Sequence, residues 1–266
     1  MKVIVFQTLL DLGLITEKIF PSGKPNESIL IISTCMKSVK SWCRKNGYEY
    51  VLCEENLNWN YAHKELSSLG YEDVPEFAYD MCAQRHEYLQ RFDADLKIIL
   101  DNDIWVHINF ELPDVKVGLC KSSLYSYDSP QKLKRTVMKP ISIAQQLSGS
   151  HYPQGGVQFL HKDYCDHYNK WMVEKIKSSY MPLMFGDYEQ SYIFEYTRQF
   201  PQNITWLDYK YNCVPKRYSD EECRNSYLIH FPGGFKPTPL AYLPDNFKGD
   251  EFSDLQATRE IIKSYE

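Results

Sequence analysis

The sequence predicts an α/β protein in which a mostly parallel, twisted sheet is flanked by helices within a single domain. Its length of 266 residues suits one large domain of this class. Short β-rich runs alternate with helical patterns through the first half of the chain, and this alternation is typical of βαβ units with parallel strands. The sequence contains no internal repeat, low-complexity tract or linker that would divide it.

The first half of the chain has the regular part of the pattern. Runs rich in valine, isoleucine and leucine predict strands, and the helical spacing that begins at Met36 is stopped by Gly47, a residue that commonly ends helices. The last of these strands, Leu96-Lys-Ile-Ile-Leu100, is expected to be buried and ends at Asp101. The predicted strands are residues 3–8, 28–33, 48–52 and 96–100, and the predicted helices are residues 36–46 and 76–92.

The second half of the chain is less regular. Turn residues from Tyr152 to Gln158 lead into an apolar strand, and a basic stretch at residues 131–139 is expected to be a loop or the start of a helix. Further elements are predicted from periodicity: helices at residues 165–178, 187–196 and 252–265, and a strand at residues 227–231.

Composition and charge exclude several classes of function. The formal net charge of −5 argues against a nucleic-acid partner or a membrane surface, since both are usually bound by basic proteins. No segment approaches the roughly 20 apolar residues of a membrane span. The eight scattered cysteines are interpreted as reduced thiols, so we expect a cytoplasmic protein. Aromatic residues are abundant, with 21 tyrosines and 13 phenylalanines; some could stack on sugar rings, although most are expected in the core.

Two carboxylates, Asp101 and Asp103, directly follow the buried strand at residues 96–100. Ligands of open α/β sheets bind beyond the carboxyl ends of the strands. Two acids this close repel each other unless a cation neutralises them, and their hard oxygens suit Mn²⁺ or Mg²⁺. The alternative is that Asp-Asn-Asp is only a polar turn. The position after an apolar strand supports the metal site, but these residues alone leave both alternatives open.

The helix before this strand carries Arg85 in the middle of an apolar face. A buried arginine requires an anionic partner. Either an internal carboxylate or a ligand phosphate satisfies this requirement, and the residues themselves leave both open.

A second group of polar residues follows the strand at residues 227–231. His230 can ligate a metal through a neutral ring nitrogen. The glycines after it allow backbone N–H groups to approach a phosphate, and Lys236 adds a positive charge. A lone histidine of this kind is usually a core residue, but its spacing to Gly233 and Lys236 favours a ligand site.

Two acids, Asp187 and Glu189, stand at the start of a predicted helix. Acids at this position are stabilised by the helix dipole, so Asp187 could be only a helix cap. Alternatively, Asp187 or Glu189 contacts sugar hydroxyls or acts as the base for an acceptor.

Taken together, these residues resemble the GT-A-fold, DxD-containing nucleotide-sugar glycosyltransferases. The stretch from Met36 to Tyr50 is similar to the S-W…G-Y-E-Y segment of those enzymes, and Asp101-Asn102-Asp103 matches the DxD. Gly155-Gly-Val-Gln158 looks like their acceptor-side strand. The run from His230 to Pro237 follows the H-F-x-G-x-x-K-P element of the glycogenin-like transferases.

The resemblance implies a GT-A domain over residues 1–266, with a nucleotide-binding half at 1–107 and an acceptor-binding half at 108–266. It implies transfer of a sugar from a nucleotide-sugar, a UDP-sugar in the first instance, to a glycan hydroxyl. The lack of an N-terminal anchor is more like bacterial or large-DNA-virus enzymes than Golgi ones, which would place a viral member in the host cytoplasm. The roles implied by the resemblance are Asp101, Asp103 and His230 as ligands of Mn²⁺ or Mg²⁺; Phe6, Gln7, Thr8, Arg85, Asn102, Gly233 and Lys236 as donor-binding residues; and Asp187 or Glu189 facing the sugar.

Two other classes of function compete with this interpretation. A nucleotidyltransferase or sugar-nucleotide pyrophosphorylase also binds a nucleotide and a metal on a parallel sheet. It would usually have a basic, glycine-rich loop after the first strand, and residues 8–13 lack arginine and lysine. A non-catalytic carbohydrate-binding module would explain the aromatic residues but would not need the two acids, the distant histidine and the lysine.

Overall fold

The chain forms two compact units, each assembled from separate stretches of sequence. A computed structural model describes residues 1–8, 25–53, 85–121, 153–178, 189–214 and 218–231. The first unit contains residues 1–55, 94–114 and 209–266, and the second contains residues 56–93 and 115–208. The division into a nucleotide-binding half at residues 1–107 and an acceptor-binding half at residues 108–266 stays a prediction.

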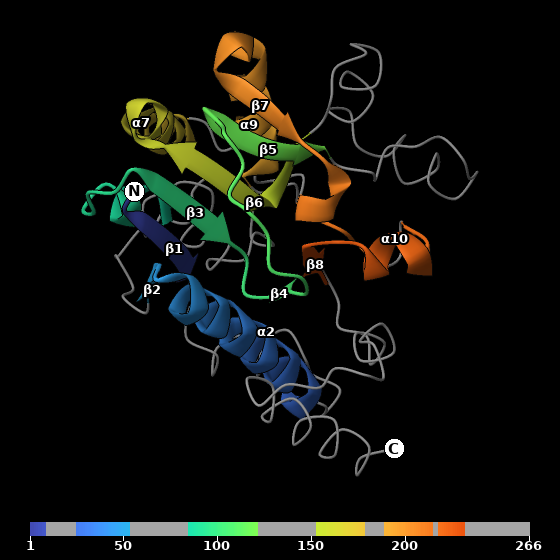
Figure 1. The fold of residues 1–266 in the computed structure, drawn as a ribbon. Helices are drawn as coiled ribbons and strands as arrows, with labels where there is room; N and C mark the ends of the chain where they lie inside the picture. Colours follow the sequence, from blue (N-terminus) through green and yellow to red (C-terminus); the bar gives the residue numbers. More distant parts are fainter. Residues whose placement is uncertain (9–24, 54–84, 122–152, 179–188, 215–217, 232–266) are drawn as a thin grey trace. The chain divides into compact units, whose positions relative to one another are not determined.

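The first unit is built on three parallel strands in the order β2, β1, β3. β1 (Val3–Thr8) pairs on one side with β2 (Glu49–Cys53) and on the other with β3 (Leu96–Leu100). The side chains of β3 are all buried, including that of Lys97, and burial on both faces explains why its other four residues are apolar. Because β1 and β3 run in the same direction, both end at one edge of the sheet (Figure 1). Asp101 lies at that edge, since it directly follows the last residue of β3.

Helix α2 (Pro25–Asn46) extends further toward the N-terminus than the sequence pattern indicated. The strand predicted at residues 28–33 is wrong, since those residues form the first part of α2. A short apolar run does not distinguish a strand from a buried helix, and Pro25 is well suited to the first turn of a helix. Gly47 ends the helix in a left-handed conformation with φ 69°, as expected.

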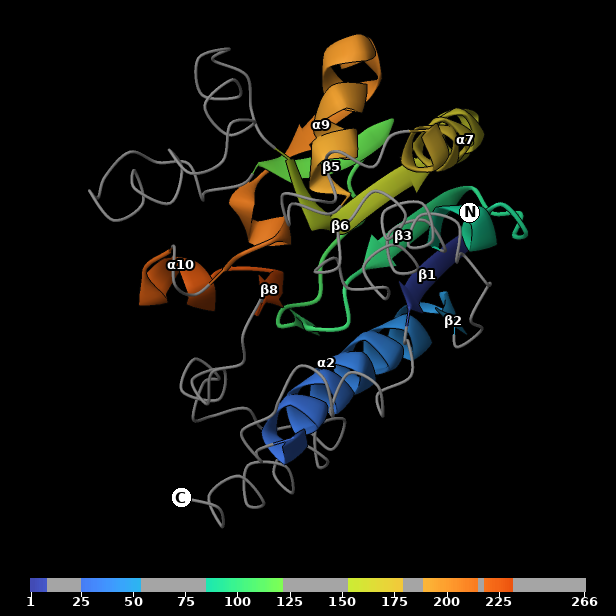
Figure 2. The same cartoon turned by 180° about the vertical axis from the view of Figure 1, so that it is seen from behind.

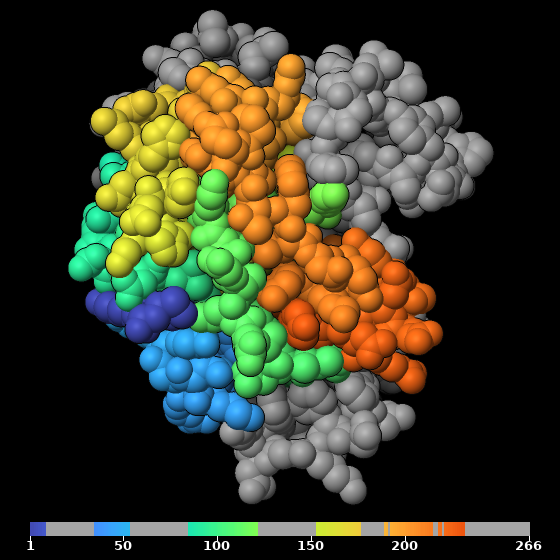
Figure 3. Space-filling model, turned by 45° about the horizontal axis from the view of Figure 1, so that its top comes forward, coloured from blue at the N-terminus to red at the C-terminus, as the bar shows by residue number. Residues whose placement is uncertain are grey.

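A two-stranded antiparallel sheet also belongs to the first unit. It joins β4 (Ile104–Val106) to β8 (Leu228–His230), with Ile104 opposite His230. The hydroxyl of Ser38 on α2 accepts a hydrogen bond from the Val106 amide at 3.1 Å, which holds the helix against β4. In the space-filling view the green segment around β4 adjoins blue α2 on one side and the orange-red segment of α10 (Asp220–Arg224) and β8 on the other (Figure 3).

The second unit contains β6 (Pro153–His161), which pairs antiparallel with β5 (Val117–Lys121), and β5 pairs parallel with β7 (Ile204–Leu207). Helices α7 (Lys162–Ser178) and α9 (Gln190–Gln199) pack against β6, and Figure 2 shows this layer from behind. The expected turn at the start of β6 is absent from its described residues, because the strand already begins at Pro153 and includes both following glycines.

The predicted class, an α/β fold with a mostly parallel sheet flanked by helices, is confirmed. Of the helix predicted at residues 76–92, the structure describes residues 85–92, and the helix ends at residue 89. The helix predicted at residues 187–196 corresponds to α9, displaced by three residues. The expectations for residues 131–139 and 252–265 lie outside the described residues. None of the helices in the described part of the chain is long and apolar enough to cross a membrane.

Candidate functional site

The polar end of β3 is formed by the Asp101–Asp103 segment. The Asp101 carbonyl accepts hydrogen bonds from the Ile104 amide at 3.2 Å and from the Gln7 side-chain amide at 3.0 Å. The first bond turns the chain from β3 into β4, and the second ties this turn to the end of β1. Both carboxylates keep partial exposure.

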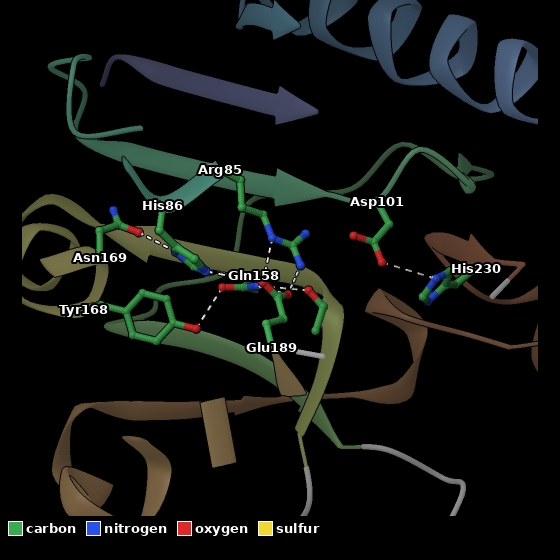
Figure 4. A network of polar contacts seen from close by, with 9 residues as sticks. Arg85, His86, Asp101, Gln158, Tyr168, Asn169, Glu189 and His230 are labelled. Atoms are coloured by element: carbon green, nitrogen blue, oxygen red, sulfur yellow. Dashed lines mark hydrogen bonds and ion pairs between the residues drawn. The ribbon is translucent and has the colours of Figure 1, made fainter. Parts of the chain in front are cut away.

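His230 reaches the two carboxylates from the end of β8. Its neighbour Phe231 donates a backbone hydrogen bond to the Asp103 carbonyl at 3.1 Å, so the β4–β8 ladder fixes the histidine beside the turn. Nε2 of His230 lies 3.2 Å from Oδ1 of Asp103. The same atom lies 3.7 Å from Oδ2 of Asp101 (Figure 4). One ligand atom from each of the three residues lies within 4.8 Å of the other two.

This donor set fits a divalent cation. The Asp101 and Asp103 oxygens are hard ligands, and an imidazole nitrogen extends the set toward Mn²⁺ more than toward Mg²⁺, which strongly prefers oxygen. Without a cation or a proton, two carboxylates and an imidazole lone pair repel each other at these distances. Nearby, Oδ1 of Asn102 is buried and has no hydrogen-bond partner among the described residues, which suits a site that is completed by a ligand.

The residues predicted to line a nucleotide pocket lie at the end of β1. Phe6 and Gln7 are fully buried, and Thr8 is partly exposed. The Gln7 side chain accepts a hydrogen bond from the Tyr50 hydroxyl at 2.9 Å while it donates to Asp101. Gln7 therefore supports the turn that carries the acids, and contact of these three residues with a nucleotide stays a prediction.

A buried polar network occupies the second unit, and Arg85 and Glu189 form its centre (Figure 4). Nε of Arg85 donates to Oε2 of Glu189 at 2.7 Å, and Nη2 contacts Oε1. The Gln158 amide donates to Oε1 of Glu189 at 3.1 Å and accepts from the Tyr168 hydroxyl at 2.8 Å. The anionic partner that the sequence predicted for Arg85 is thus the Glu189 carboxylate in this structure. Contact of Arg85 with a nucleotide-sugar stays a prediction.

Glu189 is 2% exposed, and both of its oxygens accept hydrogen bonds. The approach of the carboxylate to β6 depends on Gly155, because a Cβ atom there would lie 2.7 Å from Oε1 of Glu189. Glycine at position 155 of β6 therefore leaves room for the Glu189 carboxylate, which a larger side chain would displace.

His86 extends the same network. Its Nδ1 lies 2.8 Å from Oδ1 of Asn169, and its Nε2 lies 3.4 Å from Oε2 of Glu189. Burial, together with the nearby positive charge of Arg85, lowers the pKa of His86 to about 3, so the ring is neutral at ordinary pH.

Several functional candidates of the sequence lie outside the described residues, namely Asp187, Gly233 and Lys236. Conversely, the structure adds buried polar residues that sequence reasoning did not single out. These are Asn212 beside His230, and His86, Tyr168 and Asn169 around Glu189. The apolar pattern around these residues does not predict which residues they contact, because their partners come from distant parts of the sequence.

Comparison with solved structures shows which known proteins share this fold. A glycosyltransferase involved in the glycosylation of the major capsid of PBCV-1 matches 88% of this chain and 95% of its own chain, with a TM-score of 0.54 and 16% identity. The glycosyltransferase GlyE of Streptococcus pneumoniae TIGR4 aligns over 99% of this chain and 63% of its own, with a TM-score of 0.48 and 10% identity. No protein-family model and no curated protein matches the sequence. The chain therefore has a glycosyltransferase fold, as the GT-A resemblance predicted.

Proposed function

We propose that this protein is a metal-dependent glycosyltransferase that moves a sugar from a nucleotide-sugar, a UDP-sugar in the first instance, to a hydroxyl of a glycan. The observation that carries the proposal is the convergence of Asp101, Asp103 and His230 within 4.8 Å at the carboxyl end of β3. On a glycosyltransferase fold, this edge of the sheet is where a donor diphosphate would bind.

The proposed mechanism depends on stabilisation of the leaving diphosphate. A divalent cation, when bound, supplies positive charge against the negative charge that builds on the diphosphate. Asp101, Asp103 and His230 hold that cation, and we assign Gly233 and Lys236 to the diphosphate itself. Gln7 contributes indirectly, because its hydrogen bond to the Asp101 carbonyl fixes the turn that carries both acids.

We assign the role of facing the sugar to Asp187 rather than to Glu189. A base or a sugar contact requires a free oxygen lone pair within reach of the ligand. Glu189 is buried, with both oxygens engaged by Arg85 and Gln158. Glu189 then keeps Arg85 in place, and Asp187, two residues earlier, is the acid left for the substrate.

The partners that follow from this proposal are a nucleotide-sugar donor and a glycan acceptor, with the reaction in the cytoplasm. As the acceptor we propose a capsid or surface glycan of a large virus, since the PBCV-1 glycosyltransferase with a similar fold is involved in the glycosylation of the major capsid.

Calorimetric titration with UDP, in the presence and absence of Mn²⁺, tests the proposal. We expect UDP to bind only with Mn²⁺, and Asp103→Ala to abolish this binding. Asp163→Ala is the matched control, because Asp163 is an exposed acid in the first turn of α7. Metal-independent UDP binding that is identical in wild type and Asp103→Ala would contradict the proposal.

A screen of nucleotide-sugars for hydrolysis then identifies the donor and separates the competing functions. A glycosyltransferase releases the nucleoside diphosphate and free sugar in this assay. A pyrophosphorylase instead forms a nucleotide-sugar and pyrophosphate from a nucleoside triphosphate and a sugar phosphate. A carbohydrate-binding module binds a sugar without metal and turns over neither mixture.

A further inference from the structure

Asn212 lies directly behind His230, on the side opposite the two acids. Oδ1 of Asn212 is 2.9 Å from Nδ1 of His230, and the two residues are 4% and 1% exposed. Asn212 follows the short helix η3 (Tyr209–Tyr211), so it is distant in sequence from the histidine that it contacts.

This hydrogen bond determines which nitrogen of His230 carries the proton. The carbonyl oxygen of an asparagine side chain only accepts hydrogen bonds, so Nδ1 of the ring must be the donor. A histidine that ligates a metal is neutral and has one N–H, so with the proton on Nδ1 the lone pair for the metal is on Nε2. That lone pair lies on the atom that is 3.2 Å from Asp103 and 3.7 Å from Asp101.

The backbone holds Asn212 in register with the histidine. The next residue, Cys213, donates its amide to the Leu228 carbonyl at 3.0 Å and accepts from the His230 amide at 2.7 Å. These two bonds join residue 213 to β8 as a parallel bridge, so the Asn212 side chain has little freedom to move away from the ring. Asn212 is therefore held in place to support the His230 ring, because the backbone at residue 213 and the Asn212 side chain both contact β8.

We propose that Asn212 is the positioning residue of the candidate metal centre: it keeps His230 in the Nδ1–H tautomer and aims Nε2 at the cation held by Asp101 and Asp103. The inference rests on the proposed function, since it requires that these three residues bind a metal. Hydrogen-bonded partners of metal-ligating histidines typically contribute about 10- to 100-fold to metal affinity.

The second unit offers a matched control with the same chemistry. Nδ1 of His86 is 2.8 Å from Oδ1 of Asn169, and both residues are fully buried. Because His86 and Asn169 are not among the candidate metal ligands, Asn169→Leu removes an equivalent buried hydrogen bond without touching the metal centre.

Binding of Mn²⁺ alone, followed by electron paramagnetic resonance of the free ion, tests the inference on the full chain. We expect Asn212→Leu to weaken Mn²⁺ binding about 10- to 100-fold, while Asn212→Asp, which keeps the acceptor oxygen, binds at least as tightly as wild type. Asn169→Leu should retain the wild-type affinity. Thermal unfolding of each variant identifies any that fails to fold.

A measurement on the metal-free protein keeps the inference testable even if an Asn212 variant is unstable. Histidine-selective ¹⁵N labelling reports the tautomer of each ring, and comparison with His230→Ala assigns the His230 signals. We expect the wild-type ring to carry its proton on Nδ1. A ring that carries its only proton on Nε2 in the wild-type protein would overturn the inference.

The results separate failure of the inference from failure of the proposed function. If His230→Ala weakens Mn²⁺ binding and Asn212→Leu does not, the metal centre stands and the role of Asn212 is refuted. If neither Asp103→Ala nor His230→Ala changes Mn²⁺ binding, the metal centre itself is refuted, and the inference fails with it.

Discussion

Arg85 and Glu189, which are separated by more than a hundred positions in the sequence, form a buried ion pair with Nε of Arg85 2.7 Å from Oε2 of Glu189. Arg85 is 9% exposed and Glu189 is 2% exposed. Removing two charges from water is costly, and the cost is offset only when the pair is close and its remaining donors and acceptors are satisfied. The Gln158 amide supplies one such additional hydrogen bond.

The first prediction concerns this pair. Arg85→Ala should destabilise the protein by about 3–5 kcal/mol, because it leaves the Glu189 charge buried without its partner. The double variant Arg85→Met/Glu189→Leu should be less destabilised than Arg85→Ala, since no unpaired charge remains. Urea unfolding measures both free energies, and a loss of less than about 1 kcal/mol in Arg85→Ala would show that the pair is not buried as described.

The second prediction concerns Gly155, which lies against Glu189. A methyl group at Gly155 would lie 2.7 Å from Oε1 of Glu189, so Gly155→Ala should cost about 1–3 kcal/mol through overpacking. Glu189→Asp shortens the acid, and in this background Gly155→Ala should cost less. Urea unfolding of the two single variants and the double variant gives the coupling energy, which would be near zero if the two residues were not in contact.

The candidate metal centre was largely predictable because its residues follow local rules. Asp101 and Asp103 directly follow an apolar strand, and parallel strands place such residues at one edge of the sheet. His230 also ends a strand, and only its distance to the acids required the structure. Asn212 could not be predicted, because its contact depends on the backbone bridge between Cys213 and Ile229 rather than on any local pattern.

The wrong predictions about the fold also have physical causes. The apolar run at residues 28–33 has neither the length nor the spacing to separate a strand from a helix, and α2 includes it. Gly155 looked like a turn residue because glycine is common in turns, but the structure has it inside β6, where Glu189 approaches closely.

The third prediction is a dependence of stability on pH that originates at His86. Its pKa is lowered from the usual 6.5 to about 3, first by burial and second by Arg85. The unfolded chain therefore binds a proton at His86 at a higher pH than the folded protein does. The resulting stability is complete above the unfolded pKa and is lost as the pH falls from about 6.5 toward about 3.

His86→Gln isolates this contribution, since glutamine does not titrate. Between about pH 7 and about pH 5, the wild type should lose about 2 kcal/mol more of its unfolding free energy than His86→Gln does. Urea unfolding at the two pH values gives the difference. Equal losses in the two proteins would mean that His86 is already protonated, or exposed, in the folded state.

The last prediction separates the two acids near the start of α9. If Asp187 faces the sugar, Asp187→Asn should lower kcat about 10²- to 10⁴-fold and leave the thermal midpoint close to that of the wild type. Glu189→Gln should chiefly lower the thermal midpoint, because it leaves the buried Arg85 charge without an anionic partner. Donor turnover and thermal unfolding are measured on both variants, with Asp166→Asn, an exposed acid on α7, as the control. Loss of turnover in Glu189→Gln at an unchanged thermal midpoint, with Asp187→Asn fully active, would reverse the assignment: the carboxylate that Arg85 holds would then be the one that acts on the substrate.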